Sequence, residues 1–390
     1  MRLPEEFSFN CPLKINCGSH AVAHLPAALS AANAHAPLIL ANRDQVGKKG
    51  LNTVVDAFKT SGLTLGIYDR LPDLPEPDLM PVLARMYRDG GCDSVIAVGN
   101  GSVVDTAKCL NLMVSAGDHG ASADCGNCMD KPSVLRPLMV VATAGGNGDE
   151  VTGYANDGVH RLRSSRLVPA AVFIDPAMLG DQDDHQVVDG ALIALTHAVE
   201  TFIDASTGPM CRAYAHTAIG LIVKFLPLVL RKTDRKKNLC AVVNGQVAAG
   251  CAFSASPPGI CHVLATQFKE STDLSLGFLM SILLPHLVAE AGLVQPEQVG
   301  ELLYPMVGPD IFSVTAADLK TSRTTVLIWE FFDAINTELV QKIPTSLMGA
   351  GLTDEQINRI QSRVGRGATN GHVARIIDSA RQDPDMTAGW

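Results

Sequence analysis

The feature that most constrains the fold is a change of sequence pattern near the middle of the chain. Before it, short apolar runs alternate with patterns of helical period; after it, long helical patterns take over and strand signals fade. The expected strands are 37–41, 65–68, 94–98, 138–142 and 171–174, and the later helices include 191–203, 211–230 and 238–253. We therefore expect an α/β domain with a mostly parallel sheet over residues 1–183, followed by an all-α, helical-bundle domain over residues 184–390.

The composition argues against several classes of partner. The net charge is -9, whereas a nucleic-acid partner would require a basic face. No run of about 18 apolar residues lacks a charge, so we expect no membrane partner. The N-terminus lacks the apolar core of a signal peptide, and ten cysteines in 390 residues are not a disulfide scaffold. These features predict a cytoplasmic protein.

A glycine-rich turn directly follows the expected strand 94–98. It reads Gly99-Asn100-Gly101-Ser102, and a helical pattern begins at Val103. A strand, a glycine turn and a helix N-terminus together form an anion site, because backbone N–H groups can approach a phosphate. Taken alone, the turn fits a simple tight turn equally well.

Two longer motifs resemble those of the iron-containing (group III) alcohol dehydrogenases. Residues 99–108 are similar to that family's Gly-Gly-Gly-Ser-x-x-Asp-x-Ala-Lys, and residues 143–152 are similar to its Thr-Thr-Ala-Gly-Thr-Gly-Ser-Glu-Val-Thr. Further matches follow in family order at 175–176, 194–200, 249–254, 283–286 and 344–347. The resemblance implies an N-terminal dinucleotide-binding domain, a helical C-terminal domain, and NAD or NADP as cofactor.

The resemblance also implies which residues contact the cofactor. Residues of the glycine turn and of the following helix should cradle the pyrophosphate, and residues after the strand 138–142 should lie along the nicotinamide ribose. The first group is Gly99, Asn100, Gly101, Ser102 and Asp105, and the second is Thr143, Ala144 and Asn147.

The choice of coenzyme depends on the residues after the strand 37–41. The family often has Thr-Asp there, and its carboxylate repels a 2′-phosphate. This chain has Asn42-Arg43 instead, and a cation at that place favours NADP over NAD. Asp44 is the alternative, because a shift of one residue would restore the acid.

The family's metal site lacks two of its four ligands in this chain. The family holds a divalent ion with one Asp, a His four residues later, and two further His. His197 and His262 match two of these positions, but Ile193 and Leu276 occupy the others. Hydrocarbon offers no lone pair, and two neutral imidazoles bind a divalent ion loosely, so we do not expect a metal. Possible substitute ligands are Cys261, Asp273 and Asp189.

Without a metal, another group must stabilise the developing alkoxide and supply a proton. The candidates are His262, His197, Thr266, His160 and Lys269. Thr266 stands where the family has an additional histidine, and His160 lies near the family's conserved lysine. Retention of the histidines for packing alone is the other interpretation.

The leading interpretation is an NAD(P)-dependent alcohol dehydrogenase or carbonyl reductase that acts on a small aldehyde, ketone or alcohol. The related maleylacetate reductases act on acidic substrates without a metal, and Arg161, Arg163 and Arg166 would suit such an anion. A non-catalytic nucleotide-binding relative is the third interpretation. The family's dimers predict a homo-oligomer.

One cysteine motif lies outside these matches. Cys125 and Cys128 form a lone Cys-x-x-Cys in a polar segment, where we expect either an exposed redox pair or an inert loop pair.

Overall fold

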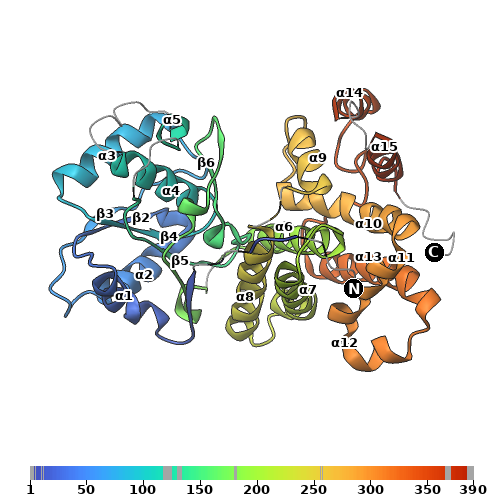
Figure 1. Cartoon of the computed structure of the whole chain (residues 1–390), viewed down its shortest axis with the longest axis horizontal. Coiled ribbons are helices and arrows are strands. Elements are labelled where there is room, and N and C mark those ends of the chain that lie inside the picture. The colour runs from blue at the N-terminus through green and yellow to red at the C-terminus, as the bar shows by residue number, and fades with distance from the viewer. Residues whose placement is uncertain are drawn as a thin grey trace. The chain divides into compact units, whose positions relative to one another are not determined.

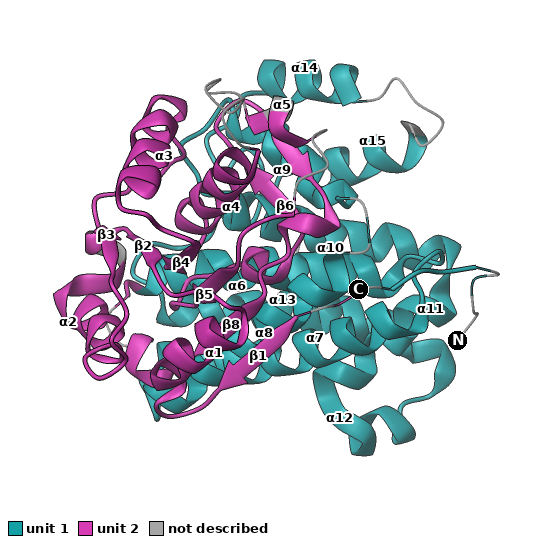
Figure 2. Cartoon of the chain, turned by 60° about the vertical axis from the view of Figure 1, so that its left-hand side comes forward, with its two compact units in different colours: residues 1–9, 184–390 teal, residues 10–183 magenta. Residues whose placement is uncertain are grey.

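The computed structural model describes residues 4, 6–9, 11, 13–116, 125–129, 134–179, 182–254, 256, 258–364 and 370–383 (Figure 1). The chain divides into two compact units (Figure 2). One contains residues 10–183, and the other contains residues 184–390 together with residues 1–9. The N-terminal segment joins the second unit through the ring of Phe9, which stacks on Tyr214 at a centroid distance of 5.7 Å.

The unit of residues 10–183 is built on a six-stranded parallel sheet in the order β1-β8-β5-β4-β2-β3, as expected for an α/β domain. Its strands are β1 (Lys14–Cys17), β2 (Pro37–Ala41), β3 (Gly66–Tyr68), β4 (Ser94–Val98), β5 (Leu138–Val141) and β8 (Ala171–Ile174). Its α-helices are α1 (Leu25–Ala31), α2 (Arg43–Asp56), α3 (Met80–Asp89), α4 (Ser102–Ser115) and α5 (Cys125–Met129). Its 3-10 helices are η1 (Ala21–His24), η2 (Pro77–Leu79), η4 (Asp149–Val151), η5 (Ser165–Leu167) and η6 (Pro176–Met178).

Helices cover both faces of this sheet, with α3 and α4 above it and α1 and α2 below it in Figure 1. The four central strands are therefore buried along their whole length, which explains their continuous apolar sequences. The sequence missed three strands: the edge strand β1, and the hairpin of β6 (Tyr154–Asn156) and β7 (Arg161–Arg163). All three are short and polar or charged, so they lack the apolar runs that mark a strand.

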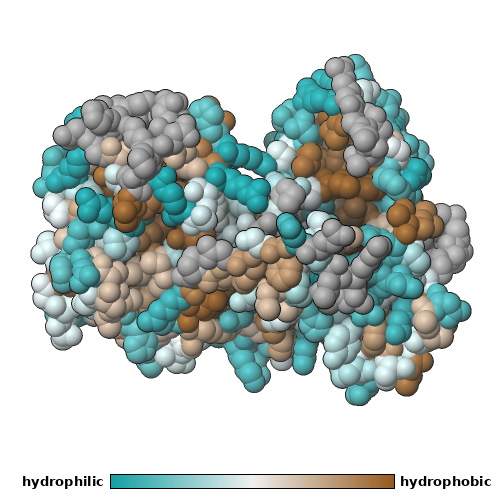
Figure 3. Space-filling view, viewed as in Figure 1, coloured by the Kyte–Doolittle hydropathy of each residue, from teal (hydrophilic) through white to brown (hydrophobic). Residues whose placement is uncertain are grey.

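The other unit is helical, as expected. Its α-helices are α6 (Asp184–Ile203), α7 (Pro209–Leu230), α8 (Arg235–Phe253), α9 (Ile260–Lys269), α10 (Leu276–Val294), α11 (Pro296–Glu301), α12 (Leu303–Val314), α13 (Lys320–Glu338), α14 (Asp354–Val364) and α15 (Asn370–Ser379), and it has one further 3-10 helix, η7 (Ala317–Leu319). On the face shown in Figure 3, hydrophobic side chains gather between α9 and α15.

Three helices of this unit, α6, α7 and α10, are long and apolar enough to cross a membrane by length and composition alone. Their most apolar stretches are 83%, 39% and 72% buried inside the protein, respectively. The apolar character of α6 and α10 is therefore that of helices in a protein core.

The Cys-x-x-Cys pair is not exposed, which corrects the expectation of an exposed redox pair. Cys125 and Cys128 lie in the short helix α5, and both are buried. The thiol of Cys125 is hydrogen-bonded to Cys109 of α4, and this bond and burial raise the pKa of the Cys109 thiol well above its usual value. A thiol held in its protonated form by burial is a poor nucleophile.

Candidate active site

The topology of the sheet brings the predicted cofactor residues to one edge. Strand β4 pairs with β2 on one side and with β5 on the other, while the chain reaches β4 from β3 at the far edge. The strand order therefore reverses between β2 and β4, and dinucleotides bind outside the carboxyl ends of the strands at such a point. Ala41, Val98 and Val141 are in register there. All the predicted cofactor residues follow these three strand ends.

The glycine turn after β4 has the backbone that an anion site requires. Gly99 has φ +149° and Gly101 has φ +48°, and α4 begins at Ser102 without a side-chain cap. A Cβ atom added at Gly101 would meet no atom within 4 Å, so the turn borders open space. The Ser102 hydroxyl donates a hydrogen bond to the carbonyl of Pro72 at 3.0 Å, which leaves its lone pairs available as acceptors. The turn can therefore receive a phosphate at the N-terminus of α4.

A single side chain joins this turn to the residues after β5. The Asn100 amide donates to the Thr143 hydroxyl at 3.0 Å and to the Ala144 carbonyl at 3.2 Å. Asn147 in turn holds Asp149, accepting a hydrogen bond from its backbone N–H and donating one to its carboxylate. Asn100 thus joins the glycine turn to Thr143 and Ala144, which are both buried.

Lys108 of α4 holds residues 149–154, the segment that follows the predicted cofactor residues after β5. Its side chain is fully buried, and its ammonium donates to the carbonyls of Asp149 at 2.7 Å, Thr152 at 2.9 Å and Tyr154 at 2.7 Å. Burial lowers the pKa of Lys108, whereas the nearby carboxylate of Asp105 raises it. Three carbonyl dipoles and neighbouring acids therefore compensate a buried cation.

Two carboxyl groups beside Lys108 have raised pKa values. Burial and the nearby Asp149 raise the pKa of Asp105. Burial raises the pKa of Glu150 to about 7, whereas the backbone N–H groups of Glu150 and Gly148 act to lower it. The Glu150 carboxyl lies against Gly146, where an added Cβ would be 3.1 Å from Oε1.

Arg43, the side chain expected to select NADP over NAD, already forms an ion pair within the protein. The guanidinium of Arg43 forms an ion pair with Asp69, which follows β3, and the amide of the preceding residue, Asn42, donates to Asp73 at 2.9 Å. The side chain of Asp44, the alternative acid, lies outside the described residues. A 2′-phosphate at this place would therefore have to compete with Asp69 for Arg43.

In the helical unit, the two predicted histidines are in direct contact. Nε2 of His197 on α6 lies 3.0 Å from Nδ1 of His262 on α9, and the His197 ring stacks on Phe253 at 4.2 Å. Burial and the neighbouring His262 hold the pKa of His197 well below its usual value. Across this contact one imidazole nitrogen donates the hydrogen bond and the other accepts it.

The other catalytic candidates occupy separate places. Thr266 lies one turn after His262 on α9 and donates its hydroxyl to the His262 carbonyl at 2.8 Å. Lys269 follows on the same helix and is exposed, with its ammonium 3.3 Å from the Asp273 carbonyl. His160 belongs to the β6–β7 hairpin of the other unit, where its ring lies 3.4 Å from the carboxylate of Asp157.

Models of one protein family match both units of the chain. The model for iron-containing alcohol dehydrogenase matches residues 12–176, and the model for the C-terminal domain of that family matches residues 187–369. The chain belongs to the iron-containing alcohol dehydrogenase family.

Individual family members share modest identity with this chain. It is 31% identical to the "Probable alcohol dehydrogenase EutG" of Escherichia coli over 262 residues, or 61% of this chain and 65% of that protein. It is 24% identical to the NAD-dependent methanol dehydrogenase of Bacillus methanolicus, over 63% of this chain and 69% of that protein. Among solved structures, sulfoacetaldehyde reductase from Bifidobacterium kashiwanohense in complex with NAD+ superimposes with a TM-score of 0.81, at 17% identity, over 97% of this chain and all of that one.

The residues at the family's metal position do not fit a metal ion in this member. Ile193 is a buried residue of α6, and Leu276 is the first residue of α10. Within the described parts of the chain, no group of three or more His, Cys, Asp or Glu side chains is placed to hold a metal. The histidine pair alone would leave half of a tetrahedral shell without protein ligands.

Two of the three substitute ligands that the sequence suggested, Asp189 and Cys261, are engaged in other interactions. The carboxylate of Asp189 accepts the N–H of Gly277 at 2.7 Å and so caps α10. The N–H of Cys261 donates to the buried carboxyl of Glu200 at 2.7 Å, and its thiol is hydrogen-bonded to the same group. Asp273 contacts Lys269 through its carbonyl. Asp189 therefore stabilises the start of the helix that Leu276 begins.

The arginines that suggested an anionic substrate also have local partners. Arg163 lies over the ring of Tyr154 at 5.3 Å, and Arg166 donates to the carbonyl of Met129 at 3.1 Å. Sequence reasoning missed Asp69 and Asp73 as neighbours of the coenzyme position and Glu200 as the partner of Cys261. Their only sequence signal is that they are acids next to predicted element ends, which is too general to identify them.

Proposed function

We propose that this protein is an NAD(P)-dependent oxidoreductase that interconverts a small aldehyde or ketone and its alcohol without a metal ion. The observation that carries the proposal is the open glycine turn at the uncapped N-terminus of α4, located at the reversal point of the parallel sheet. That arrangement supports a pyrophosphate. Membership of a family of alcohol dehydrogenases supports the reaction type.

The dinucleotide-binding residues of this proposal all belong to the α/β unit. Backbone N–H groups at Gly101 and Ser102 would bind the pyrophosphate, and Thr143 and Ala144 would border the nicotinamide ribose. When bound, a nicotinamide dinucleotide gives or takes the hydride. Asn100 positions both groups because it hydrogen-bonds across the two turns.

The proposal assigns proton transfer to the His197–His262 pair. The two rings are hydrogen-bonded to one another, and a coupled imidazole pair can act in general acid–base catalysis. The hydroxyl of Thr266, one turn further along α9, is a further polar group of that helix and donates to the His262 carbonyl. His160 and Lys269 remain further candidates as hydrogen-bond donors to an alkoxide.

The coenzyme in this proposal is NADP(H) in preference to NAD(H), with Arg43 as the phosphate ligand. The ion pair between Arg43 and Asp69 limits the preference for NADP(H) over NAD(H), because a 2′-phosphate must displace the Asp69 carboxylate from Arg43. A cytoplasmic location and self-association remain predictions of the sequence.

The proposal is tested by binding and turnover measurements on the purified protein. Calorimetric titration with NADPH and NADH measures the coenzyme, and a panel of short aldehydes and alcohols measures turnover with chelator, Zn²⁺ or Fe²⁺ present. We expect coenzyme binding, turnover that chelation leaves unchanged, and less than one metal ion per chain. Coenzyme binding without turnover of any substrate would support the non-catalytic alternative.

A restoring variant sharpens the test of metal independence. Ile193→Asp with Leu276→His returns a carboxylate and an imidazole to the family's ligand positions and should raise the metal content toward one per chain. Ile193→Val with Leu276→Met is the control, because it changes both positions without adding a ligand. One tightly held metal per chain in the unmodified protein would refute a metal-free mechanism.

A further inference from the structure

A pocket with a volume of about 1050 Å³ lies within the helical unit. It is formed by the end of α6, the first turn of α7, the α10–α11 connection, η7 and the start of α13. It shares no lining residue with the predicted cofactor and proton-transfer residues. Its size is that of a pocket for a small organic molecule.

The wall of this pocket contains a buried arginine that lacks an ionic partner. Arg212 is 3% exposed; one terminal nitrogen donates to the carbonyl of Asp204 at 2.9 Å, and its Nε has no hydrogen-bond partner. The carboxylate of Asp204 instead accepts from the N–H and hydroxyl of Ser206. In the described parts of the chain, no acidic side chain lies within ion-pair distance of Arg212, but the Asp204 carboxylate is close enough to raise its pKa and so offsets part of the cost of burial.

The position of Arg212 in α7 adds to the cost of its charge. It lies in the first turn of a 22-residue helix whose first turn contains no acid and whose N-cap, Gly208, makes no side-chain hydrogen bond. A cation at a helix N-terminus is opposed by the helix dipole, and burial adds the loss of hydration. Burial accordingly lowers the pKa of Arg212. An anion beside the guanidinium would remove both penalties.

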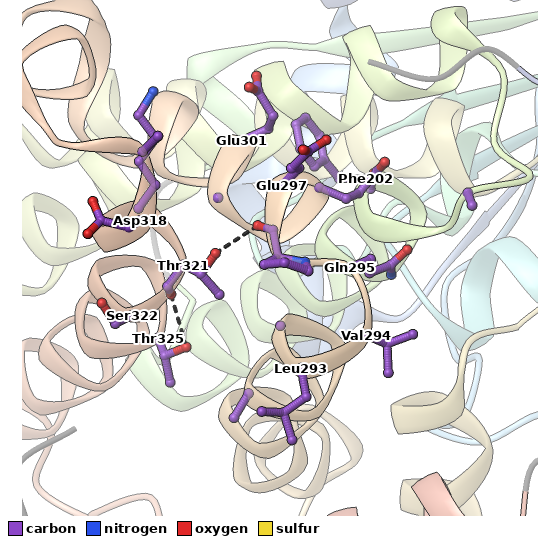
Figure 4. A pocket seen from close by; sticks show the side chains of 18 of the residues that line it. Phe202, Leu293, Val294, Gln295, Glu297, Glu301, Asp318, Thr321, Ser322 and Thr325 are labelled. Carbon is purple, nitrogen blue, oxygen red and sulfur yellow. Dashed lines mark hydrogen bonds between the residues drawn. The ribbon is translucent and has the colours of Figure 1, made fainter.

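The rest of the pocket indicates the kind of anion. Leu293 and Val294, both largely exposed, form an apolar wall, whereas the exposed carboxylates of Glu297, Glu301 and Asp318 lie at the opposite end in Figure 4. Three carboxylates repel a polyanion such as inorganic phosphate or a nucleotide. A single negative charge with an apolar body is compatible with both ends of the pocket.

The second cation of the pocket is already occupied. The ammonium of Lys320 lies 3.4 Å from the ring centroid of Phe312, a cation–π contact. Arg212 is therefore the cation of the pocket that makes no aromatic contact in the described residues, and it is the one we consider for an anionic ligand.

We propose that this pocket binds a small organic monocarboxylate, with its carboxylate on the guanidinium of Arg212 and its apolar body against Leu293 and Val294. The site is independent of the proposed redox chemistry and requires no coenzyme. Its ligand would compensate the charge that the fold leaves unpaired.

The test is calorimetric titration of the coenzyme-free protein with hexanoate, hexanamide and inorganic phosphate. We expect saturable binding of hexanoate in the millimolar range or tighter, and binding at least about tenfold weaker for the neutral hexanamide and for phosphate. Equal binding of hexanoate and hexanamide, or tighter binding of phosphate, would overturn the proposal without any variant.

Two variants locate the binding. Arg212→Met should abolish hexanoate binding without lowering the melting temperature, because an unpaired buried cation is replaced by an apolar chain of similar length. Lys320→Met, the matched control in the same pocket, should change the affinity less than about threefold. Unaltered hexanoate binding in Arg212→Met would contradict the assignment; if that variant fails to fold, the comparison of hexanoate with hexanamide still decides.

Discussion

Replacement of Lys108 by Met should unfold the α/β unit more easily and weaken coenzyme binding. The change removes three hydrogen bonds to the carbonyls of Asp149, Thr152 and Tyr154 and leaves them buried beside α4. An unsatisfied buried acceptor costs about 1–3 kcal/mol, and loss of a buried, compensated charge costs about 3–5 kcal/mol. Because the three bonds form one cluster and are not additive, we expect a total loss of about 3–5 kcal/mol in the free energy of unfolding.

The measurement is urea unfolding followed by circular dichroism, with Lys49→Met as the control. Lys49 is exposed, so its replacement should change the free energy of unfolding by less than about 0.5 kcal/mol. For a unit of residues 10–183, about 3–5 kcal/mol corresponds to a fall in melting temperature on the order of 10 °C. NADPH titration below the melting range should show an affinity at least about tenfold lower, a loss of roughly 1.4 kcal/mol.

The result that would refute this reasoning is a Lys108→Met variant within about 1 kcal/mol of the parent in stability. In that case the methionine side chain, or a rearrangement of residues 149–154, would compensate the lost bonds. An unstable variant with unchanged coenzyme affinity would separate the two claims. Lys108 would then stabilise the α/β unit without positioning the predicted coenzyme-binding residues.

Three further predictions concern the α/β unit. Gly101→Val should abolish coenzyme binding in a folded protein, because the side chain would enter the open space at the turn. Gly62→Val is the control for backbone strain, because Gly62 also has a positive φ and an added Cβ there would meet no atom within 4 Å. Retained coenzyme binding in Gly101→Val would show that the phosphate site has been assigned to the wrong turn. Asp69→Asn should strengthen NADPH binding several-fold, because it frees Arg43 from its ion pair. Arg43→Ala should weaken the binding of NADPH by about 1–3 kcal/mol and leave the binding of NADH unchanged. Calorimetric titration measures both, and equal changes for NADPH and NADH would contradict the assignment. Burial raises the pKa of Glu150 to about 7 in the folded state, so the folded protein holds this proton more tightly than the unfolded chain does. The contribution of Glu150 to the free energy of unfolding is therefore fully present below the pKa of the unfolded chain and is lost as the pH rises through 7. Glu150→Gln should therefore remove about 2–3 kcal/mol of the stability lost between pH 5 and pH 8, measured by urea unfolding; parallel pH profiles for the two proteins would count against the shifted pKa.

Much of the fold could be predicted because its information is local. A strand such as β4, buried on both faces, needs a continuous apolar run, and the turn after it needs glycines at positive φ. The assignment of Ile193 and Leu276 to two metal-ligand positions rests on single residues within an ordered series of motifs, and it stays a prediction. Short polar strands such as β1 and the β6–β7 hairpin were missed because they have no such local signal. They are strands because of the strands with which they pair.

The sequence by itself therefore determined the order of the buried strands and the change to helices, the location of the glycine turn and the chemical identity of the candidate side chains. Only the tertiary structure decided which groups meet: Arg43 with Asp69, Lys108 with three carbonyls, His197 with His262, and Asp189 with the N-terminus of α10. Each of these contacts joins segments that the chain brings together through a crossover or a helix packing. The charge state of a side chain depends on such neighbours and on burial, which no local pattern encodes.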